Sequence, residues 1–146
     1  MFRTVFLRSR YTRFVYVVLL SLILVAIRTS AADDRPELSL RARPKLAFAP
    51  VEIMFTGLIR GGKDDNEDFY CVSAEWDWDD GTKSESIFDC EPYEAGSSEI
   101  RRRFSRRHSY AVGGDYEVRL TLKRRDDVVD SARVNVVIRG GRLRDD

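Results

Sequence analysis

Trp76-Asp77-Trp78-Asp79-Asp80-Gly81-Thr82 is the stretch that decides the fold. From Tyr70 to Trp78 every second residue is aromatic or aliphatic, the smallest being Ala74. The residues between them are mostly polar. Such alternation is typical of a strand with one buried face. The dipeptide Asp80-Gly81 favours a two-residue type I′ turn, in which both residues have positive φ. The stretch therefore predicts a strand that ends in a tight hairpin, with Trp76 packed between two sheets.

The same period of two recurs on both sides of this stretch. Apolar and polar residues alternate within 51–56, 116–122 and 134–138, and glycine-containing turns separate the segments. Residues 99–110 fit a helical turn through Ile100 and Phe104, or a strand on which Phe104, His108 and Tyr110 share a face; we favour the strand. No sustained helical stripe or internal repeat is present. These features predict an all-β sandwich.

Two further motifs follow in order, His108-Ser109-Tyr110 and the alternating segment Gly114–Thr121. Together with Trp76–Thr82 they resemble the PKD (polycystic kidney disease) domain family across residues 50–139. Members carry a Trp-Asp-Phe-Gly-Asp-Gly-Thr type run, a His-Thr-Tyr element and a Gly-x-Tyr-x-Val-x-Leu strand. This chain departs from that pattern in having Trp78 for Phe, Asp79 for the first Gly, and Ser109 for Thr.

The resemblance implies an immunoglobulin-like antiparallel β-sandwich of about seven strands, acting outside the cell as an interaction or spacer module without catalysis. Tyr116, near the start of its strand, is placed like a tyrosine corner. His108 is expected to pack or cap near a strand start, as the motif histidine of the family does. The residues that carry the family motif or core are Trp76, Asp77, Trp78, Asp80, Gly81, Thr82, His108, Tyr110, Gly114 and Tyr116.

The N-terminus has the features of an export signal. Residues 3–13 contain four arginines and no acidic residue, which makes this region positively charged. A 14-residue apolar run over 14–27 and the small residues 29–32 follow. A bilayer-spanning helix needs about 20 apolar residues, so residues 1–32 predict a cleaved signal helix and a secreted or periplasmic domain. An uncleaved signal-anchor, with the domain outside the membrane, is the alternative. An extended lead-in over 33–49, the sandwich over 50–139 and a polar tail over 140–146 complete the expected organisation.

Charge is divided unevenly along the chain. The 146 residues hold 25 Lys and Arg against 24 Asp and Glu, a net charge of +1. Residues 61–99 hold 2 basic and 13 acidic residues, whereas residues 100–125 hold 9 basic and 2 acidic ones. We therefore expect an acidic tract and a basic tract on one sandwich.

Cys71 and Cys90 are the two cysteines of the chain. In an oxidising compartment an isolated pair predicts a disulfide. A turn centred between Asp80 and Gly81 would place the two cysteines opposite each other, with Cα atoms about 4.5–5.5 Å apart. A redox-active pair is not favoured because the C-x-x-C spacing is absent. Two cysteines and the single His108 do not suffice for a structural zinc site.

Two acidic loops are a candidate calcium site. In an immunoglobulin-like topology the loop around residues 64–68 and the late loop around residues 124–130 emerge from the same end, and carboxylates from two loops suit Ca²⁺. A solvated acidic loop is the alternative. Asp79 and Asp80 are expected at the opposite end, in turn formation. The candidate calcium ligands are Asp64, Asp65, Glu67, Asp68 and Asp127, with Asp126 and Asp130 nearby.

A basic run is a candidate site for phosphate or an anionic polysaccharide, because arginine binds such groups through paired hydrogen bonds. Two alternatives are that these side chains protect an exposed edge strand or pair with the acidic tract of the same domain. Nucleic acid is not expected for an exported domain with few stacking aromatics nearby. The run consists of Arg101, Arg102, Arg103, Arg106 and Arg107.

Catalytic patterns are missing from the sequence. It has one histidine, no Gly-x-Ser-x-Gly, no Walker loop and no zinc pattern, so we expect no enzyme and no required cofactor. The sequence predicts a non-catalytic module that binds a protein or a polysaccharide at the cell surface, with membrane contact only through an uncleaved leader. The alternative is a structural envelope component tethered by that uncleaved segment.

Overall fold

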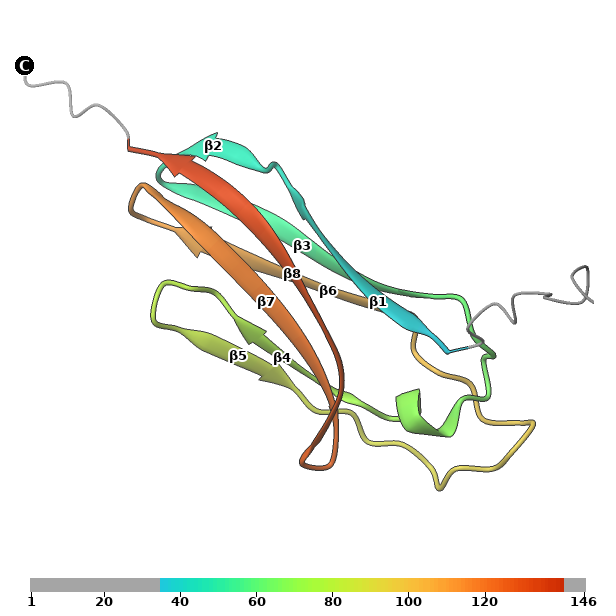
Figure 1. Cartoon of the computed structure of the whole chain (residues 1–146). Coiled ribbons are helices and arrows are strands. Elements are labelled where there is room, and N and C mark those ends of the chain that lie inside the picture. Colours follow the sequence, from blue (N-terminus) through green and yellow to red (C-terminus); the bar gives the residue numbers. More distant parts are fainter. Residues whose placement is uncertain (1–34, 141–146) are drawn as a thin grey trace, which may run out of the picture. The chain divides into compact units, whose positions relative to one another are not determined.

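A computed structural model describes residues 35–140, which form two β-sheets and one short 3₁₀ helix (Figure 1). All the alternating segments form strands, and residues 99–110 contain a strand as favoured. The elements are β1 (Glu37–Arg43), β2 (Leu46–Phe48), β3 (Val51–Arg60), η1 (Glu67–Phe69), β4 (Ser73–Asp77), β5 (Lys83–Ser86), β6 (Arg103–Tyr110), β7 (Gly114–Arg124) and β8 (Asp127–Arg139).

The strands form a three-stranded sheet in the order β1-β3-β6 and a five-stranded sheet in the order β2-β8-β7-β4-β5. Neighbouring strands are antiparallel except for β2 and β8, which are parallel. The predicted all-β, two-sheet architecture is confirmed. The described residues contain eight strands rather than about seven.

The additional strands come from residues 33–49, and the expectation of a lead-in outside the sandwich is wrong. β1 pairs with β3 along its whole length and buries Leu38, Leu40 and Ala42 in the core. The chain passes Pro44 and then adds β2 to the other sheet beside β8. The sandwich therefore begins before residue 50, because alternating residues before Pro44 pair with β3.

The predictions for residues 1–32 and for most of the tail over 140–146 concern residues outside the described range. Between residues 35 and 140 there is no helix long and apolar enough to cross a membrane.

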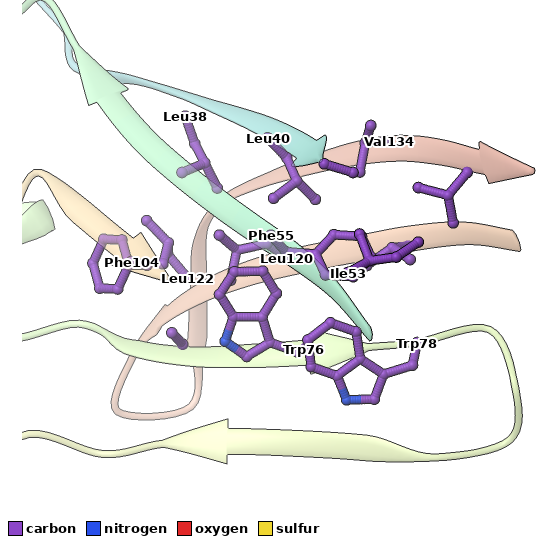
Figure 2. Close-up of a cluster of buried hydrophobic side chains, with 14 of the residues drawn as sticks. Leu38, Leu40, Ile53, Phe55, Trp76, Trp78, Phe104, Leu120, Leu122 and Val134 are labelled. Atoms are coloured by element: carbon purple, nitrogen blue, oxygen red, sulfur yellow. The ribbon is translucent and has the colours of Figure 1, made fainter. Parts of the chain in front are cut away.

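The core lies between the two sheets and follows the predicted parity (Figure 2). Trp76 and Trp78 are each 1% exposed and stack with ring centroids 5.3 Å apart, and Phe55 of β3 reaches Trp78 from the other sheet at 5.3 Å. Trp76 therefore packs between the sheets as predicted. The large side chains labelled in the figure come from β1, β3, β4, β6, β7, β8 and the residue after β4.

A glycine sets the distance between the sheets at the middle of β3. Gly57 faces inward, and a Cβ atom placed there would lie 2.3 Å from the Leu120 side chain of β7. Absence of a side chain lets Leu120 fill this space. Close backbone approach is one of the roles that favour glycine inside a strand.

Candidate functional site

The hairpin between β4 and β5 has a different loop from the one predicted. Asp77 pairs with Lys83, and positive φ occurs at Asp79 (61°) and Gly81 (85°) rather than at Asp80 and Gly81. The connection is thus not a type I′ turn. Aspartate side chains determine this loop, because the Asp77 carboxylate accepts a hydrogen bond from the Asp79 N–H at 3.2 Å. Such side-chain turns compete with the standard hairpin.

Asp80 connects this loop to the three-stranded sheet. Its Oδ1 accepts hydrogen bonds from the N–H and the hydroxyl of Thr82 at 3.0 and 2.6 Å, and its Oδ2 lies 2.7 Å from Nε2 of His108. Burial raises the pKa of Asp80, but the hydrogen bonds from Thr82 and His108 outweigh it, so the pKa lies below its ordinary value. The prediction of a turn role for Asp80 therefore covers only part of its contacts.

The other motif residues also act within the fold. His108 lies inside β6, not near its start as expected, and its ring stacks on Trp78 with centroids 4.4 Å apart. The buried Tyr110 hydroxyl donates to the Trp78 carbonyl at 3.0 Å, and burial raises the pKa of Tyr110. The Tyr116 hydroxyl donates to the carbonyl of residue 112 at 2.9 Å, which confirms the predicted tyrosine corner.

A disulfide joins Cys71 and Cys90, as predicted, with Cα atoms 6.1 Å apart. The predicted pairing geometry is wrong, because the hairpin register is shifted by one residue and both cysteines lie outside the paired part of β4 and β5. The bond instead fixes the start of the long segment between β5 and β6. The Tyr70 hydroxyl, which donates to the carbonyl of residue 91 at 2.9 Å, adds a second link there.

The two acidic loops lie close together, as the topology predicts, but their carboxylates do not gather. Asp64 pairs with Arg102, and Glu67 pairs with Arg124 at 2.9 Å. A cavity of about 380 Å³ between the loops is lined by arginines as well as by Glu67, Asp68 and Asp127. Nowhere in residues 35–140 do three or more histidine, cysteine or acidic side chains form a group that could hold a metal ion. The arrangement expected for calcium is therefore not formed.

The five arginines of the basic run separate into two groups. Arg102 and Arg106 have the parity of the inward side of β6, and Arg101 lies before β6; these three contact other parts of the domain. Arg102 donates to the carbonyls of residues 61 and 62 and pairs with Asp64, Arg106 donates to the Ser86 hydroxyl at 2.9 Å, and the Arg101 guanidinium lies 4.1 Å from the Phe88 ring centroid. The alternative in which the arginines pair with the acidic tract of the same domain thus holds for Arg102.

The other two, Arg103 and Arg107, are exposed on the outer side of the three-stranded sheet, where β6 is an edge strand as expected for a run that protects an edge. The neighbouring strands contribute more arginines on the same side. We call this surface the arginine face; it consists of Arg41, Arg43, Arg60, Arg103 and Arg107 around Met54, Thr56 and Leu58.

The register shows how the arginine face is built. Met54 of β3 lies between Arg43 of β1 and Arg107 of β6, and Leu58 pairs with Arg103. Adjacent strands are about 4.8 Å apart, so the backbones of Arg43 and Arg107 are separated by about 10 Å. A groove of about 340 Å³ runs over the half-buried β3 residues; it is lined by Arg41, Arg43, Met54, Thr56, Leu58 and Arg103.

Positive charge exceeds negative charge on this side of the sheet. Its two acidic residues are Glu37, opposite Arg60 in the register, and Glu52, which lies 3.2 Å from Arg107. Arg41, Arg43 and Arg103 form no ion pair with any carboxylate in the described part of the chain. Sequence reasoning missed Arg41 and Arg43 because it assigned them to a lead-in. The signal was present, since they alternate with the apolar residues that β1 buries.

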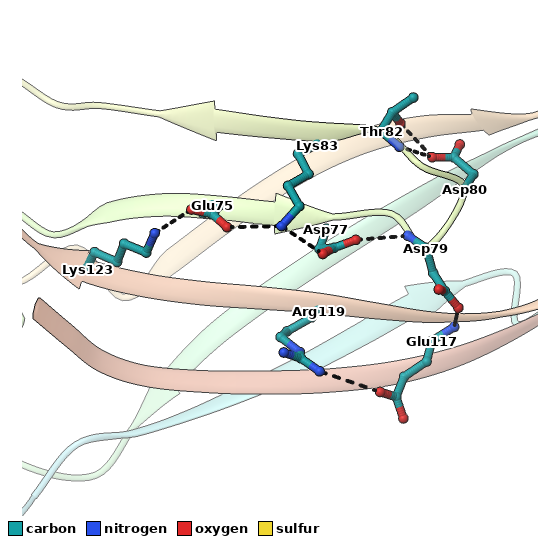
Figure 3. Close-up of polar contacts among 9 residues, drawn as sticks. All are labelled: Glu75, Asp77, Asp79, Asp80, Thr82, Lys83, Glu117, Arg119 and Lys123. Carbon is teal, nitrogen blue, oxygen red and sulfur yellow. Dashed lines mark hydrogen bonds and ion pairs between the residues drawn. The ribbon is translucent and has the colours of Figure 1, made fainter. Parts of the chain in front are cut away.

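The outer side of the five-stranded sheet is different, because its charges neutralise one another (Figure 3). Lys83 lies 3.1 Å from Asp77, Lys123 pairs with Glu75, and Arg133 lies 3.2 Å from Glu117. The hydrogen bond from Lys123 lowers the pKa of Glu75, and that from Lys83 lowers the pKa of Asp77. Excess positive charge is thus a property of the arginine face and not of both outer faces.

Comparison with known proteins assigns no family. No family model and no curated protein matches the sequence. Among solved structures, a CARDB domain from Pyrococcus furiosus, crystallised in complex with di-metal ions, is 9% identical with a TM-score of 0.46, covering 73% of this chain and 94% of that one. Its solution NMR structure is 13% identical with a TM-score of 0.44, covering 71% and 94%. These values carry no conclusion about function, and the PKD resemblance stays a prediction.

Proposed function

We propose that this chain is a non-catalytic binding domain that acts outside the cytoplasm and uses the arginine face to hold a negatively charged partner. The observation that carries the proposal is the groove along β3, bordered by Arg41, Arg43 and Arg103 without carboxylate partners among the described residues. Arginine binds carboxylate, sulfate or phosphate groups through paired hydrogen bonds. Its charge also attracts an oppositely charged partner before contact.

The apolar floor of the groove favours a partner that carries apolar groups as well as negative charge. Met54 and Leu58 are half-buried and apolar, and arginines border them. An apolar centre with a polar rim, enriched in methionine and arginine, is the composition of many protein interfaces. No aromatic side chain lines the groove, so a neutral sugar ring would have no stacking platform. These features favour a charged macromolecular surface over a neutral glycan.

The fold is consistent with an adhesive or interaction role, and we propose an immunoglobulin-like sandwich of the PKD type. The chain passes from β1 in one sheet to β2 in the other; β3 and β6 then join the sheet of β1, whereas β4, β5, β7 and β8 join that of β2. This distribution of strands is like that of immunoglobulin domains. The tyrosine corner and the buried Trp76 add two hallmarks of that architecture.

Two observations support the compartment and the non-catalytic role. The Cys71–Cys90 disulfide suits an oxidising environment, in agreement with export through residues 1–32. His108 is engaged between Trp78 and Asp80, so the one histidine of the chain has a structural task. The proposal needs no cofactor.

The test measures salt-dependent retention of the exported protein on immobilised heparin, used as a polyanionic probe. The face variant Arg41→Ser/Arg43→Ser/Arg103→Ser should elute at clearly lower salt than the wild type, because screened charge interactions supply the retention. A matched control, Lys83→Ser/Arg119→Ser/Arg133→Ser, removes three positive charges from the outer side of the five-stranded sheet and should elute close to the wild type. Equal loss in both variants would contradict the proposal, and thermal unfolding checks that both are folded.

A further inference from the structure

A second charged surface lies on the same domain, along the end of β5 and the segment that leads from β5 to β6. Residues 84–99, which we call the acidic segment, contain no lysine or arginine and five acidic residues: Glu85, Asp89, Glu91, Glu94 and Glu99. At its start, Glu85, Ile87 and Asp89 are exposed, whereas the residues between them turn towards the domain. Ile87 is 78% exposed and lies between these two carboxylates in the sequence.

The inward residues of the acidic segment fix it to the domain. Ser86 accepts a hydrogen bond from Arg106, Phe88 packs against Phe104 and carries the Arg101 guanidinium, and Cys90 is held by the disulfide. Further along, the Tyr93 hydroxyl donates to the carbonyl of residue 65 at 2.7 Å. A surface held in place before contact loses less conformational entropy on binding.

The acidic segment and the arginine face are complementary in type and in order. The segment presents a carboxylate, an apolar side chain and a carboxylate in Glu85, Ile87 and Asp89. Across the face, the register presents an arginine, an apolar side chain and an arginine in Arg43, Met54 and Arg107. Apolar contact would remove Ile87 and Met54 from water. One carboxylate would meet Arg43, and the other would join Arg107, which already contacts Glu52.

We propose that the arginine face binds the acidic segment of a second copy of this chain. The proposal rests on the proposed function, since it takes the same face as the binding surface and names its partner. The two surfaces are different parts of the molecule: the arginine face is the outer side of β1-β3-β6, and the acidic segment borders the side where β5 and β6 are edge strands. The contact is therefore head to tail, and each bound copy keeps one unused surface. Such contacts give rings or open filaments rather than closed dimers.

The experiment measures the mass of the exported protein by light scattering and sedimentation over a concentration series at low and high salt. Wild type should exceed the monomer mass, increase with concentration and return towards monomer at high salt. Two neutralised proteins are then compared: the face variant described above and a segment variant, Glu85→Gln/Ile87→Ser/Asp89→Asn. Each alone should associate at least tenfold more weakly than wild type. Their equimolar mixture should form a one-to-one complex that does not grow, because it contains one intact surface of each kind.

A control variant, Asp115→Asn/Glu117→Gln, removes two carboxylates from strand β7 outside the acidic segment and should associate like wild type. Thermal midpoints of all variants establish that they are folded. A wild type that stays monomeric, or a mixture that stays monomeric while wild type associates, overturns the inference. If wild type is monomeric and the face variant still loses heparin retention, the inference fails and the proposed function stands. If the face variant keeps both its heparin retention and its self-association, both fail.

Discussion

A single carboxylate, that of Asp80, links the β4–β5 loop to the opposite sheet of the sandwich. Asp80 joins two parts of the chain, because one oxygen accepts from Thr82 within the loop and the other contacts His108 on the opposite sheet. His108 in turn covers Trp78. A residue that the turn dipeptide explains only as a loop former thus also links the two sheets.

Replacing Asp80 tests this link. In Asp80→Asn, one acceptor is lost, and we expect the free energy of unfolding at pH 7 to fall by about 1–3 kcal/mol. The folded-state pKa of Asp80 is lowered, so its contribution is complete above the unfolded value of about 3.9 and is lost as pH falls through the folded value. Urea unfolding from pH 7 down to pH 2 should therefore show a weaker loss of stability in acid for the variant.

The control for Asp80→Asn is Glu52→Gln, which removes an exposed ion pair with Arg107. Exposed pairs contribute little, so this variant should follow the wild-type curve. An Asp80→Asn protein with the acid profile of the wild type would show that the carboxylate does not link loop and sheet.

At the scale of strands, the inward and outward parity of the sequence predicts most of the architecture. The alternation before Trp78 and within 116–122 determines which side chains are buried, and both agree with the structure. The register of β4 and β5 is harder to predict from the sequence. Hydrogen bonds of aspartate side chains determine the loop between these strands, and the turn preference of the Asp80-Gly81 dipeptide does not include them. β1 was missed because prolines on both sides obscured its alternation.

The candidate site was predictable only in part for the same reason. Arg103 and Arg107 could be picked out from the basic run, but Arg41 and Arg43 join them only through the pairing of β1 with β3. Alternation along β6 also assigns Arg102 and Arg106 to structural contacts. A basic run therefore overstates the site on its own strand and omits the part contributed by another.

Gly57 gives an element-scale prediction. In Gly57→Ala, the new methyl group would overlap Leu120, and overpacking should lower the free energy of unfolding by about 1–3 kcal/mol. The neighbouring variant Thr56→Ala changes the outer side of the same strand and should cost less. Chemical denaturation of both variants makes the comparison. A Gly57→Ala protein as stable as wild type would mean that the sheets can separate here without cost.

For the whole molecule, the distribution of charge over the surface says more about binding than the net charge of +1 does. One outer face carries paired charges, the other carries excess arginine, and a fixed segment at the side carries excess carboxylate. The Cys71–Cys90 disulfide is one of the contacts that hold that segment, so we expect an oxidising environment to help to fix the acidic surface.

Removing the disulfide should destabilise the entire domain. Cys71 and Cys90 are 19 residues apart, and closing a loop of this size is worth about 3 kcal/mol in the chain-entropy model. We expect Cys71→Ser/Cys90→Ser to lose about that amount in urea unfolding. Reductant should lower the stability of wild type similarly and leave the double variant unchanged. A reductant effect of equal size in both proteins would contradict a stabilising disulfide.

The passage of the chain from β1 in one sheet to β2 in the other has a mechanical consequence. The described chain begins near the first residues of β8, where Arg35 donates to the carbonyl of residue 129, and ends after β8 at Gly140 (Figure 1). Tension between these ends would slide β2 along its parallel neighbour β8, where the hydrogen bonds from Ala49 to Arg139 and from Val137 to Lys45 lie across the pull. Bonds loaded in this way share the force and must break together, so we expect the pair of β2 and β8 to resist tension along the strands better than a pair whose bonds open one at a time.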